Sequence, residues 1–199
     1  MIDSQAHYTE HVFKEVHLDH DELISSEFHD CLFSTCSFVE SVFRRCRFVN
    51  CTFRDCDLSL LRLPDSVWAA ARFEECKVVG VNWSEAYWPK AGLGNPLGFF
   101  KCAISHSTFI GLRLQGIQIK ECLAVDVDFR EADLSGAEFG GTDLSGSLFG
   151  STDLSEADLS RARNYHIDPA QNNLKQAKFS LPEAMSLLHS MDIVLVDGD

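Results

Sequence analysis

The large apolar residues of this chain recur every five positions over most of its length. A first run has no miss over 16 positions: Phe13, Leu18, Leu23, Phe28, Phe33, Phe38, Phe43, Phe48, Phe53, Leu58, Leu63, Trp68, Phe73, Val78, Trp83 and Trp88. After a slip of one position, a second run adds 12 more: Ile104, Phe109, Leu114, Ile119, Ala124, Phe129, Leu134, Phe139, Leu144, Phe149, Leu154 and Leu159. This regularity predicts one structural unit repeated along the chain.

The residue two positions before each large one is mostly small, and all eight cysteines of the chain occupy this position. An α-helix rotates by about 100° per residue, so a period of five would spread the apolar stripe around its surface. A straight strand would send successive large residues to opposite faces. We therefore expect a solenoid whose chain turns a corner once per repeat and points its large and small residues at a common axis.

The five-residue pattern is clearest in Ala132-Asp133-Leu134-Ser135-Gly136 and in Ala157-Asp158-Leu159-Ser160-Arg161. It resembles the pentapeptide-repeat family over residues 11–163. The resemblance implies an all-β fold, a right-handed quadrilateral β-helix with a side for each repeat and about seven coils. We expect this β-helix over residues 1–163, and a C-terminal cap and dimerisation segment over residues 164–199.

Residues 89–98 separate the two runs and contain three glycines and two prolines. This composition predicts a loop that leaves the solenoid. Insertions in solenoids often serve binding, because rigid coils hold them in place. An irregular coil without a binding role fits the same composition.

A different pattern follows near Ser180. This serine is placed to cap a helix with Pro182 in its first turn and Glu183 at its third position. Residues 193–196 are expected to form a short strand with two apolar faces. These elements suit either a plain cap or a symmetric dimer contact. The candidate dimerisation residues are Ala184, Leu187, Leu188, Met191, Ile193 and Leu195.

The charge of the chain is acidic overall and arranged in bands. Its net charge of −13 argues against direct binding to nucleic acid and to an anionic membrane surface. Residues 1–30 carry one basic and eight acidic residues, whereas residues 41–80 carry seven basic and five acidic ones. Residues 81–120 carry four basic and one acidic, and residues 121–160 one basic and ten acidic. The last segment is therefore the most acidic.

Within residues 121–160, six carboxylates directly precede a large apolar residue and are expected to face outward. They are Asp128, Asp133, Glu138, Asp143, Asp153 and Asp158. With four repeats per coil, Asp133 is expected to stack over Asp153 and Glu138 over Asp158. Ordered carboxylates on a rod as wide as a duplex can imitate the phosphate backbone to a DNA-binding protein. Alternatively, aspartate simply suits the turns and keeps the rod soluble.

Catalytic and metal chemistry finds little support in the sequence. Within each run the cysteines lie at multiples of five residues, so they line an axis instead of converging on one zinc or iron–sulfur site. We expect free, buried thiols. The glycine-rich stretch in residues 92–98 lacks the strand–helix context of a dinucleotide site. We expect no enzyme activity, no metal and no cofactor. The chain lacks a long apolar stretch and a basic, apolar start, so we expect a cytoplasmic location with reduced cysteines.

Residues 43–53 and the tail over residues 181–196 resemble one subgroup of the pentapeptide-repeat family. This subgroup holds the Qnr quinolone-resistance proteins and the microcin B17 immunity protein. The resemblance implies a homodimer that imitates DNA, binds bacterial DNA gyrase or topoisomerase IV, and confers immunity or resistance to topoisomerase poisons. The alternative is a structural or scaffolding solenoid with a different protein partner.

Overall fold

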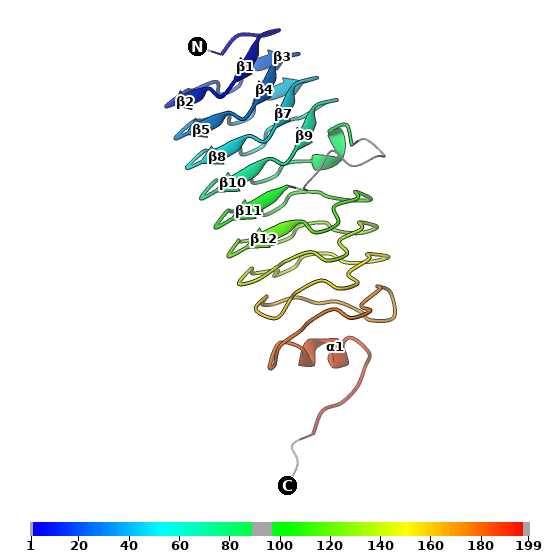
Figure 1. The fold of residues 1–199 in the computed structure, drawn as a ribbon. Helices are drawn as coiled ribbons and strands as arrows, with labels where there is room; N and C mark the ends of the chain where they lie inside the picture. The colour runs from blue at the N-terminus through cyan, green and yellow to red at the C-terminus, as the bar shows by residue number, and fades with distance from the viewer. Residues whose placement is uncertain (1, 89–96, 197–199) are drawn as a thin grey trace.

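The chain forms a rod, with the first and last described residues at opposite tips (Figure 1). The computed structural model describes residues 2–88 and 97–196. Stacked residues lie 20 positions apart, as Cys36 and Cys56 do, so four repeats make one turn. Across residues 89–96 the step becomes 26 positions, as between Cys76 and Cys102. The rod therefore has four walls, which we number in chain order.

Every strand has three residues, and all paired strands are parallel. The first wall contains β1 (His7–Thr9), β4 (Glu27–His29), β7 (Arg47–Val49) and β9 (Val67–Ala69). The second wall contains β2 (Val12–Lys14), β5 (Leu32–Ser34), β8 (Thr52–Arg54), β10 (Arg72–Glu74), β11 (Gly98–Phe100) and β12 (Gln118–Lys120). The fourth wall contains β3 (Glu22–Ile24) and β6 (Val42–Arg44).

Single β-bridges complete the walls. The third wall consists of such bridges from His17 to Arg163, and the fourth continues through Asp128 to Leu148. The named strands span about five turns of an all-β solenoid, and bridges such as that between Asp158 and Lys178 continue the ladder. The predicted repeat solenoid is confirmed. The expected count of about seven coils includes both the turns with named strands and the turns joined only by single bridges.

The inward register predicted from the five-residue period is correct. Phe28, Phe48, Phe139 and Leu144 have no exposed surface. Rings one coil apart stack face to face, so that an aromatic ladder runs along the axis of the upper coils. All eight cysteines are buried and free, as expected. Some inward residues are only partly buried: Leu18, Trp88 and Phe149.

Most corners of the chain contain a residue in the left-handed region. Leu60 has φ 58° and Ala70 has φ 52°, and glycine takes this position in some repeats, as Gly136 does with φ 66°. A residue with a Cβ atom is strained there by about 1–2 kcal/mol. The corners therefore give the fold its shape at a conformational cost that core burial offsets.

The second run begins earlier than expected, at Phe99, which is fully buried and pairs with Phe73. Leu97 is also buried, and Gly98 is the first residue of β11. These last two residues of the expected loop belong to the coil, because the chain must re-enter the ladder before it reaches Phe99. Residues 89–96, where the rest of the expected loop falls, lie outside the described residues.

The ladder also continues below Leu159. Asn173 and Lys178 form bridges with Asp153 and Asp158, and Leu174 and Phe179 pack against the core. The division into a β-helix up to residue 163 and a cap from residue 164 therefore stays a proposal. The hydrogen-bonded ladder itself extends to Lys178.

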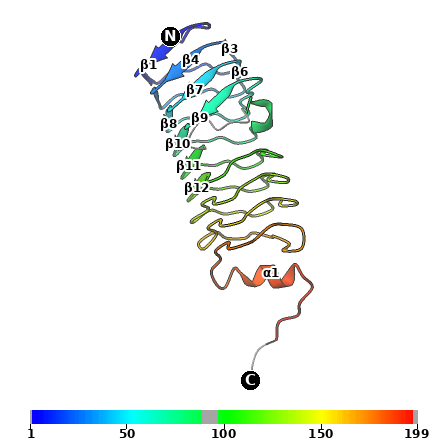
Figure 2. The ribbon, with the colours of Figure 1, turned by 45° about the vertical axis from the view of Figure 1, so that its right-hand side comes forward.

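The expected helix cap is wrong. The helix α1 spans Met185–His189, and its N-terminal flanking residue Ala184 makes no side-chain cap. The Ser180 hydroxyl instead donates to the carbonyl of Ser160 in the coil above. The helix lies across the last coil (Figures 1 and 2). The Ser190 hydroxyl at its end donates to Ile167 O at 3.0 Å.

Residues 193–196 do not form the expected strand within the chain. A strand needs a hydrogen-bonding neighbour, and the last coil is covered by α1 instead. The other helical segment, the 3-10 helix η1 (Trp83–Glu85), is shorter still, with three residues. Neither segment among residues 2–88 and 97–196 has the length and hydropathy to cross a membrane.

Candidate interaction surfaces

The six outward carboxylates of residues 121–160 form a band around the rod. The predicted stacking is confirmed by β-bridges that join Asp133 to Asp153 and Glu138 to Asp158. Successive repeats occupy successive walls, so the band reaches all four instead of forming a single face. We call this set the acidic band: Asp133 and Asp153 on the first wall, Glu138 and Asp158 on the second, Asp143 on the third and Asp128 on the fourth.

Most of these carboxylates brace the corner that follows them. In Asp143, Oδ1 accepts hydrogen bonds from Ser145 N at 3.1 Å and from Ser145 Oγ at 2.6 Å. Asp133 and Asp158 make the same pair of contacts with the serine two positions on. The sequence Asp-Leu-Ser thus forms a local turn, as the turn-forming interpretation of these aspartates expects.

Hydrogen bonds of this kind keep Asp143 and Asp153 ionised. Hydrogen bonds from Ser145 and Asn164 hold the pKa of Asp143 below its usual range. Contacts with Ser155 lower the pKa of Asp153. A carboxylate that accepts several hydrogen bonds is stabilised in its charged form. Both side chains therefore carry full negative charge at neutral pH.

Part of the acidic band is neutralised by basic residues. On the fourth wall Arg130 Nη2 lies 2.6 Å from Asp128 Oδ2. On the second wall Lys120 pairs with Glu138, and Lys178 Nζ lies 3.8 Å from Asp158 Oδ2.

The other walls differ in this respect. Within residues 2–88 and 97–196, no ion pair joins a basic residue to Asp133, Asp143 or Asp153. Two of these residues lie on the first wall and one on the third. The first and third walls are opposite sides of the coil, so unpaired negative charge faces outward in two opposite directions.

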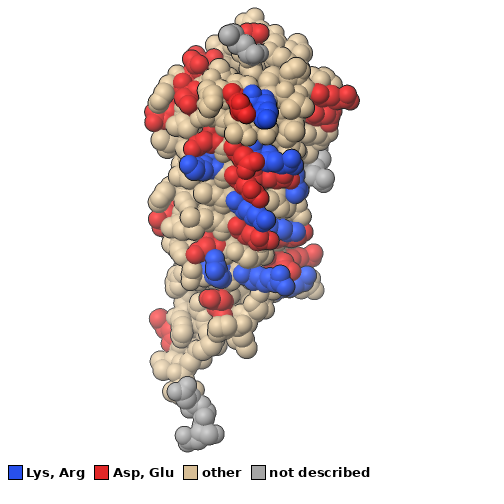
Figure 3. Space-filling view, turned by 90° about the vertical axis from the view of Figure 1, so that its left-hand side faces the viewer, with Lys and Arg blue, Asp and Glu red and all other residues tan. Residues whose placement is uncertain are grey.

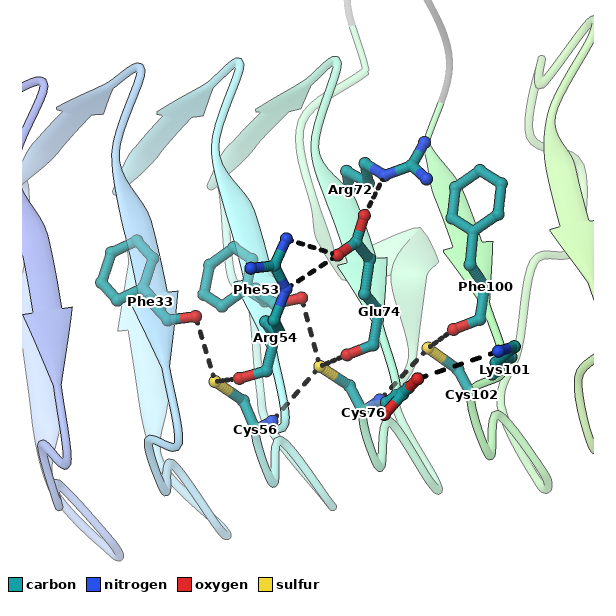
Figure 4. A network of polar contacts seen from close by, with 11 residues as sticks. Phe33, Phe53, Arg54, Cys56, Arg72, Glu74, Cys76, Phe100, Lys101 and Cys102 are labelled. Carbon is teal, nitrogen blue, oxygen red and sulfur yellow. Dashed lines mark hydrogen bonds and ion pairs between the residues drawn. The ribbon is translucent and has the colours of Figure 1, made fainter.

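The upper second wall carries a zipper of opposite charges (Figure 4). Glu74 Oε2 lies 2.8 Å from Arg54 Nη2, and its Oε1 lies 2.5 Å from Arg72 Nε. Arg72 also covers the ring of Phe100, with 3.7 Å between the guanidinium carbon and the ring centroid. Figure 3 shows basic and acidic side chains interleaved along one side of the rod. Sequence reasoning missed this zipper, because Arg54 and Glu74 lie one coil apart and only Arg72 is close to Glu74 along the chain.

The second wall also carries an open notch of about 420 Å³ beneath Lys120. It exists because Gly140 and Gly141 place no side chain there. Two of its acidic lining residues already have partners: Glu138 pairs with Lys120, and Asp158 accepts the Ser160 hydroxyl at 2.5 Å. In the described part of the chain, no three or more histidine, cysteine or acidic side chains converge so that they could hold one metal ion together.

The C-terminal segment presents an apolar surface to solvent. Leu188, Met191, Ile193 and Leu195 are 39%, 50%, 41% and 36% exposed. Of the other two expected dimerisation residues, Leu187 packs against the core and Ala184 is half-buried beside it. Of the six expected dimerisation residues, Leu187 and Ala184 thus lie toward the last coil, and the other four face solvent. Other exposed apolar side chains lie nearby: Leu181, Met185, Val194 and Val196. Val194 and Val196 belong to the expected two-sided segment 193–196, whereas sequence reasoning did not list Leu181 and Met185 as dimerisation residues.

Comparison with known proteins identifies the repeats. A family model described as "Pentapeptide repeat region" matches residues 26–96, and a model of eight pentapeptide repeats matches residues 113–150 and 128–163. No curated protein sequence matches the chain.

Solved structures match over nearly the whole chain. Trypsin-treated QnrB1, a plasmid-mediated fluoroquinolone resistance protein, has a TM-score of 0.72 at 16% identity, covering 96% of this chain and 98% of that one. HetL, involved in heterocyst differentiation regulation in the cyanobacterium Nostoc, has a TM-score of 0.66 at 18% identity, covering 88% of each chain. At these identities the likeness is one of fold.

Proposed function

The chain belongs to the pentapeptide-repeat family, and on that basis we propose that it is a non-enzymatic, cytoplasmic homodimer that imitates DNA. Its partner is bacterial DNA gyrase or topoisomerase IV. By occupying the DNA-binding surface of that enzyme, it confers immunity or resistance to topoisomerase poisons.

The unpaired part of the acidic band carries this proposal. Asp133 and Asp153 lie in one column on the first wall, and Asp143 lies on the opposite wall. A duplex likewise presents phosphates from two strands to a protein groove that encloses it. Hydrogen bonds hold these carboxylates at fixed positions, so little ordering entropy is lost on binding. Ordered charge of this kind favours a basic groove.

The exposed C-terminal surface supports the dimer. Two copies joined through Leu188, Met191 and Ile193 would double the length of the rod and cover apolar side chains that otherwise face water. A two-fold axis there would place an acidic band on each side of the junction. The occupant of this surface is therefore a second copy of the chain.

The likeness to QnrB1 agrees with this proposal. QnrB1 is a fluoroquinolone resistance protein with the same architecture over nearly its whole length. Because the similarity concerns the fold alone, the proposal has to be tested by substitutions in this chain.

A supercoiling assay tests the proposal directly. Wild-type protein is titrated into gyrase with and without a quinolone, and supercoiled product is measured. The variant carries Asp133→Lys, Asp143→Lys and Asp153→Lys together. A control carries Glu10→Lys, Asp30→Lys and Asp55→Lys, which change the net charge equally on exposed residues of the upper coils.

The expected result is inhibition or protection by the wild type and the control, and loss of the effect in the first variant. Circular dichroism shows whether each variant keeps its fold. Equal action of wild type and first variant, or no action of the wild type at micromolar concentration, rejects the DNA-mimic function.

A scaffolding solenoid with another protein partner is the second candidate. The turn-bracing contacts of Asp133, Asp143 and Asp158 favour it, because they give these residues a structural role without any partner. HetL, a regulatory protein in its own organism, shares the fold. A pull-down on gyrase separates the two candidates.

A further inference from the structure

Five buried cysteines form one straight column beside the corner between the second and third walls. We call it the thiol column: Cys36, Cys56, Cys76, Cys102 and Cys122. Its members are only 2–3% exposed. Below it, Thr142 takes the equivalent position. Part of the column is drawn in Figure 4.

The column repeats its geometry from coil to coil. The backbone N–H of each cysteine donates to Sγ of the next, with N–Sγ distances of 3.3, 3.4, 3.4 and 3.4 Å. Near-identical distances indicate that the thiols from Cys56 to Cys122 have the same orientation. Equivalent Sγ atoms are therefore separated by the strand spacing of about 4.8 Å.

We propose that adjacent thiols of this column bind a soft monovalent cation, with Cu(I) as the natural choice, in linear two-coordinate geometry. Two metal–sulfur bonds of about 2.3 Å span about 4.6 Å, close to the rise per coil. The ion replaces the protons of two thiols, which leave to solvent, and forms two sulfur–metal bonds. No electron is transferred in this step.

One contact of the column favours the bound form. Each sulfur from Cys56 to Cys122 already accepts a backbone N–H, and this donor stabilises a thiolate. The thiol protons donate to backbone carbonyls, as Cys56 does to Phe33 O and Arg54 O, and these contacts are given up when the ion replaces the protons. Thiolates of cysteine select soft ions over hard ones.

The arrangement also excludes the commoner thiolate metals. Zinc and iron–sulfur clusters need four ligands converging on a point. A straight column offers only two neighbours to an ion placed between coils.

The chain contains its own controls. Cys46 sits in another column between Ser26 and Ser66 and has no thiol one coil away. Cys31 and Cys51 form a separate stacked pair. Serine occupies the same inward position in other repeats, as at Ser107 and Ser147, so Cys→Ser changes are compatible with the fold.

The test uses the full-length, reduced protein without oxygen, equilibrated with Cu(I) supplied as its acetonitrile complex and then challenged with the chelator bicinchoninate. The Cys56→Ser/Cys102→Ser variant breaks every adjacent pair of the column. The matched variant Cys31→Ser/Cys46→Ser removes as many thiols but leaves the column intact.

With each ion using two unshared thiols, the column holds about two Cu(I), and the separate stacked pair of Cys31 and Cys51 holds one more. The wild type should therefore retain about three Cu(I), the matched variant about two and the column variant about one. X-ray absorption should show two sulfur ligands per copper. Bound copper should raise the melting temperature of the wild type more than that of the column variant.

Failure of the wild type to retain copper against the chelator overturns the proposal, as does equal retention by the column variant. Three or four sulfur ligands per copper would also reject the linear site. None of these outcomes depends on the topoisomerase function, because no enzyme is present.

Discussion

The rings of Phe28 and Phe48 stack one coil apart, with 4.8 Å between their centroids and 6° between their planes. Phe48 in turn stacks on Trp68 at 4.2 Å. Each ring thus covers the next, and the aromatic ladder couples neighbouring coils. Stability in such a solenoid is a sum of coil terms and interfaces between coils.

Removing one ring should open the ladder locally. Phe48→Ala is expected to lower the free energy of unfolding by about 3–5 kcal/mol, because it leaves a cavity between two stacked rings. Asp143→Ala should cost only about 1 kcal/mol, since it loses hydrogen bonds at the surface. Urea denaturation followed by circular dichroism measures both. Equal destabilisation by the two changes would contradict the inward and outward assignment.

The sequence predicts the inward register well. Only a chain that turns a corner once every five residues can bury both Phe28 and Phe139, which belong to the two different runs. The sequence does not show where the chain re-enters the ladder after an insertion. Phe99 lies five residues before Ile104 and so continues the second run, but it directly follows the glycine- and proline-rich residues 89–98, and its pairing with Phe73 is what places it in the ladder. Leu174 and Phe179 are hidden in the same way by the irregular residues 164–172.

The candidate surface is less predictable from sequence. The six acidic positions and their stacking follow from the period, but their pairing does not. Lys120 reaches Glu138 and Lys178 reaches Asp158 only because coils stack. Likewise, residues 193–196 have the composition of a strand, but a strand forms only with a neighbour, which the chain itself does not supply.

Stability should fall in acid. Hydrogen bonds lower the pKa of Asp143, Asp153 and Asp158 in the folded chain. A group whose folded pKa is lowered stabilises the fold above its unfolded pKa, about 3.9 for aspartate, and this contribution is lost as the pH falls through the folded value. The urea midpoint should therefore be level between about pH 6 and 5 and decline below about pH 4.

The combined change Asp143→Asn and Asp153→Asn provides the control for this acid dependence. Asparagine keeps an oxygen acceptor but cannot titrate, so the decline below about pH 4 should become shallower. An unchanged slope would show that other groups control the acid transition.

The left-handed corners predict a stabilising substitution. Ala70 turns its corner with φ 52°. Ala70→Gly should raise the free energy of unfolding by about 0.5–1 kcal/mol, because relief of strain exceeds the added flexibility of the unfolded chain. Ala137→Gly is the matched control, at a buried position outside the left-handed region, and should lose about 1 kcal/mol. Thermal or urea melts distinguish the two, and a loss at both positions would contradict the strain argument.

The last prediction concerns assembly. Leu188 is 39% exposed on α1, beside Met191 and Ile193, and an apolar cluster of this size at the end of a rod favours burial against a second copy. Light scattering of the wild type should give twice the chain mass of 22.3 kDa. Leu188→Asp should give the single mass, because it would place charge in the apolar contact. Leu123→Asp, at a 48% exposed leucine on the third wall, should remain dimeric. A wild-type monomer at high concentration would reject the dimer, and dissociation by Leu123→Asp alone would show that the contact lies elsewhere.

If the dimer carries the topoisomerase effect, Leu188→Asp should weaken inhibition of supercoiling without changing the salt dependence of the remaining binding, since the acidic band of each copy stays intact.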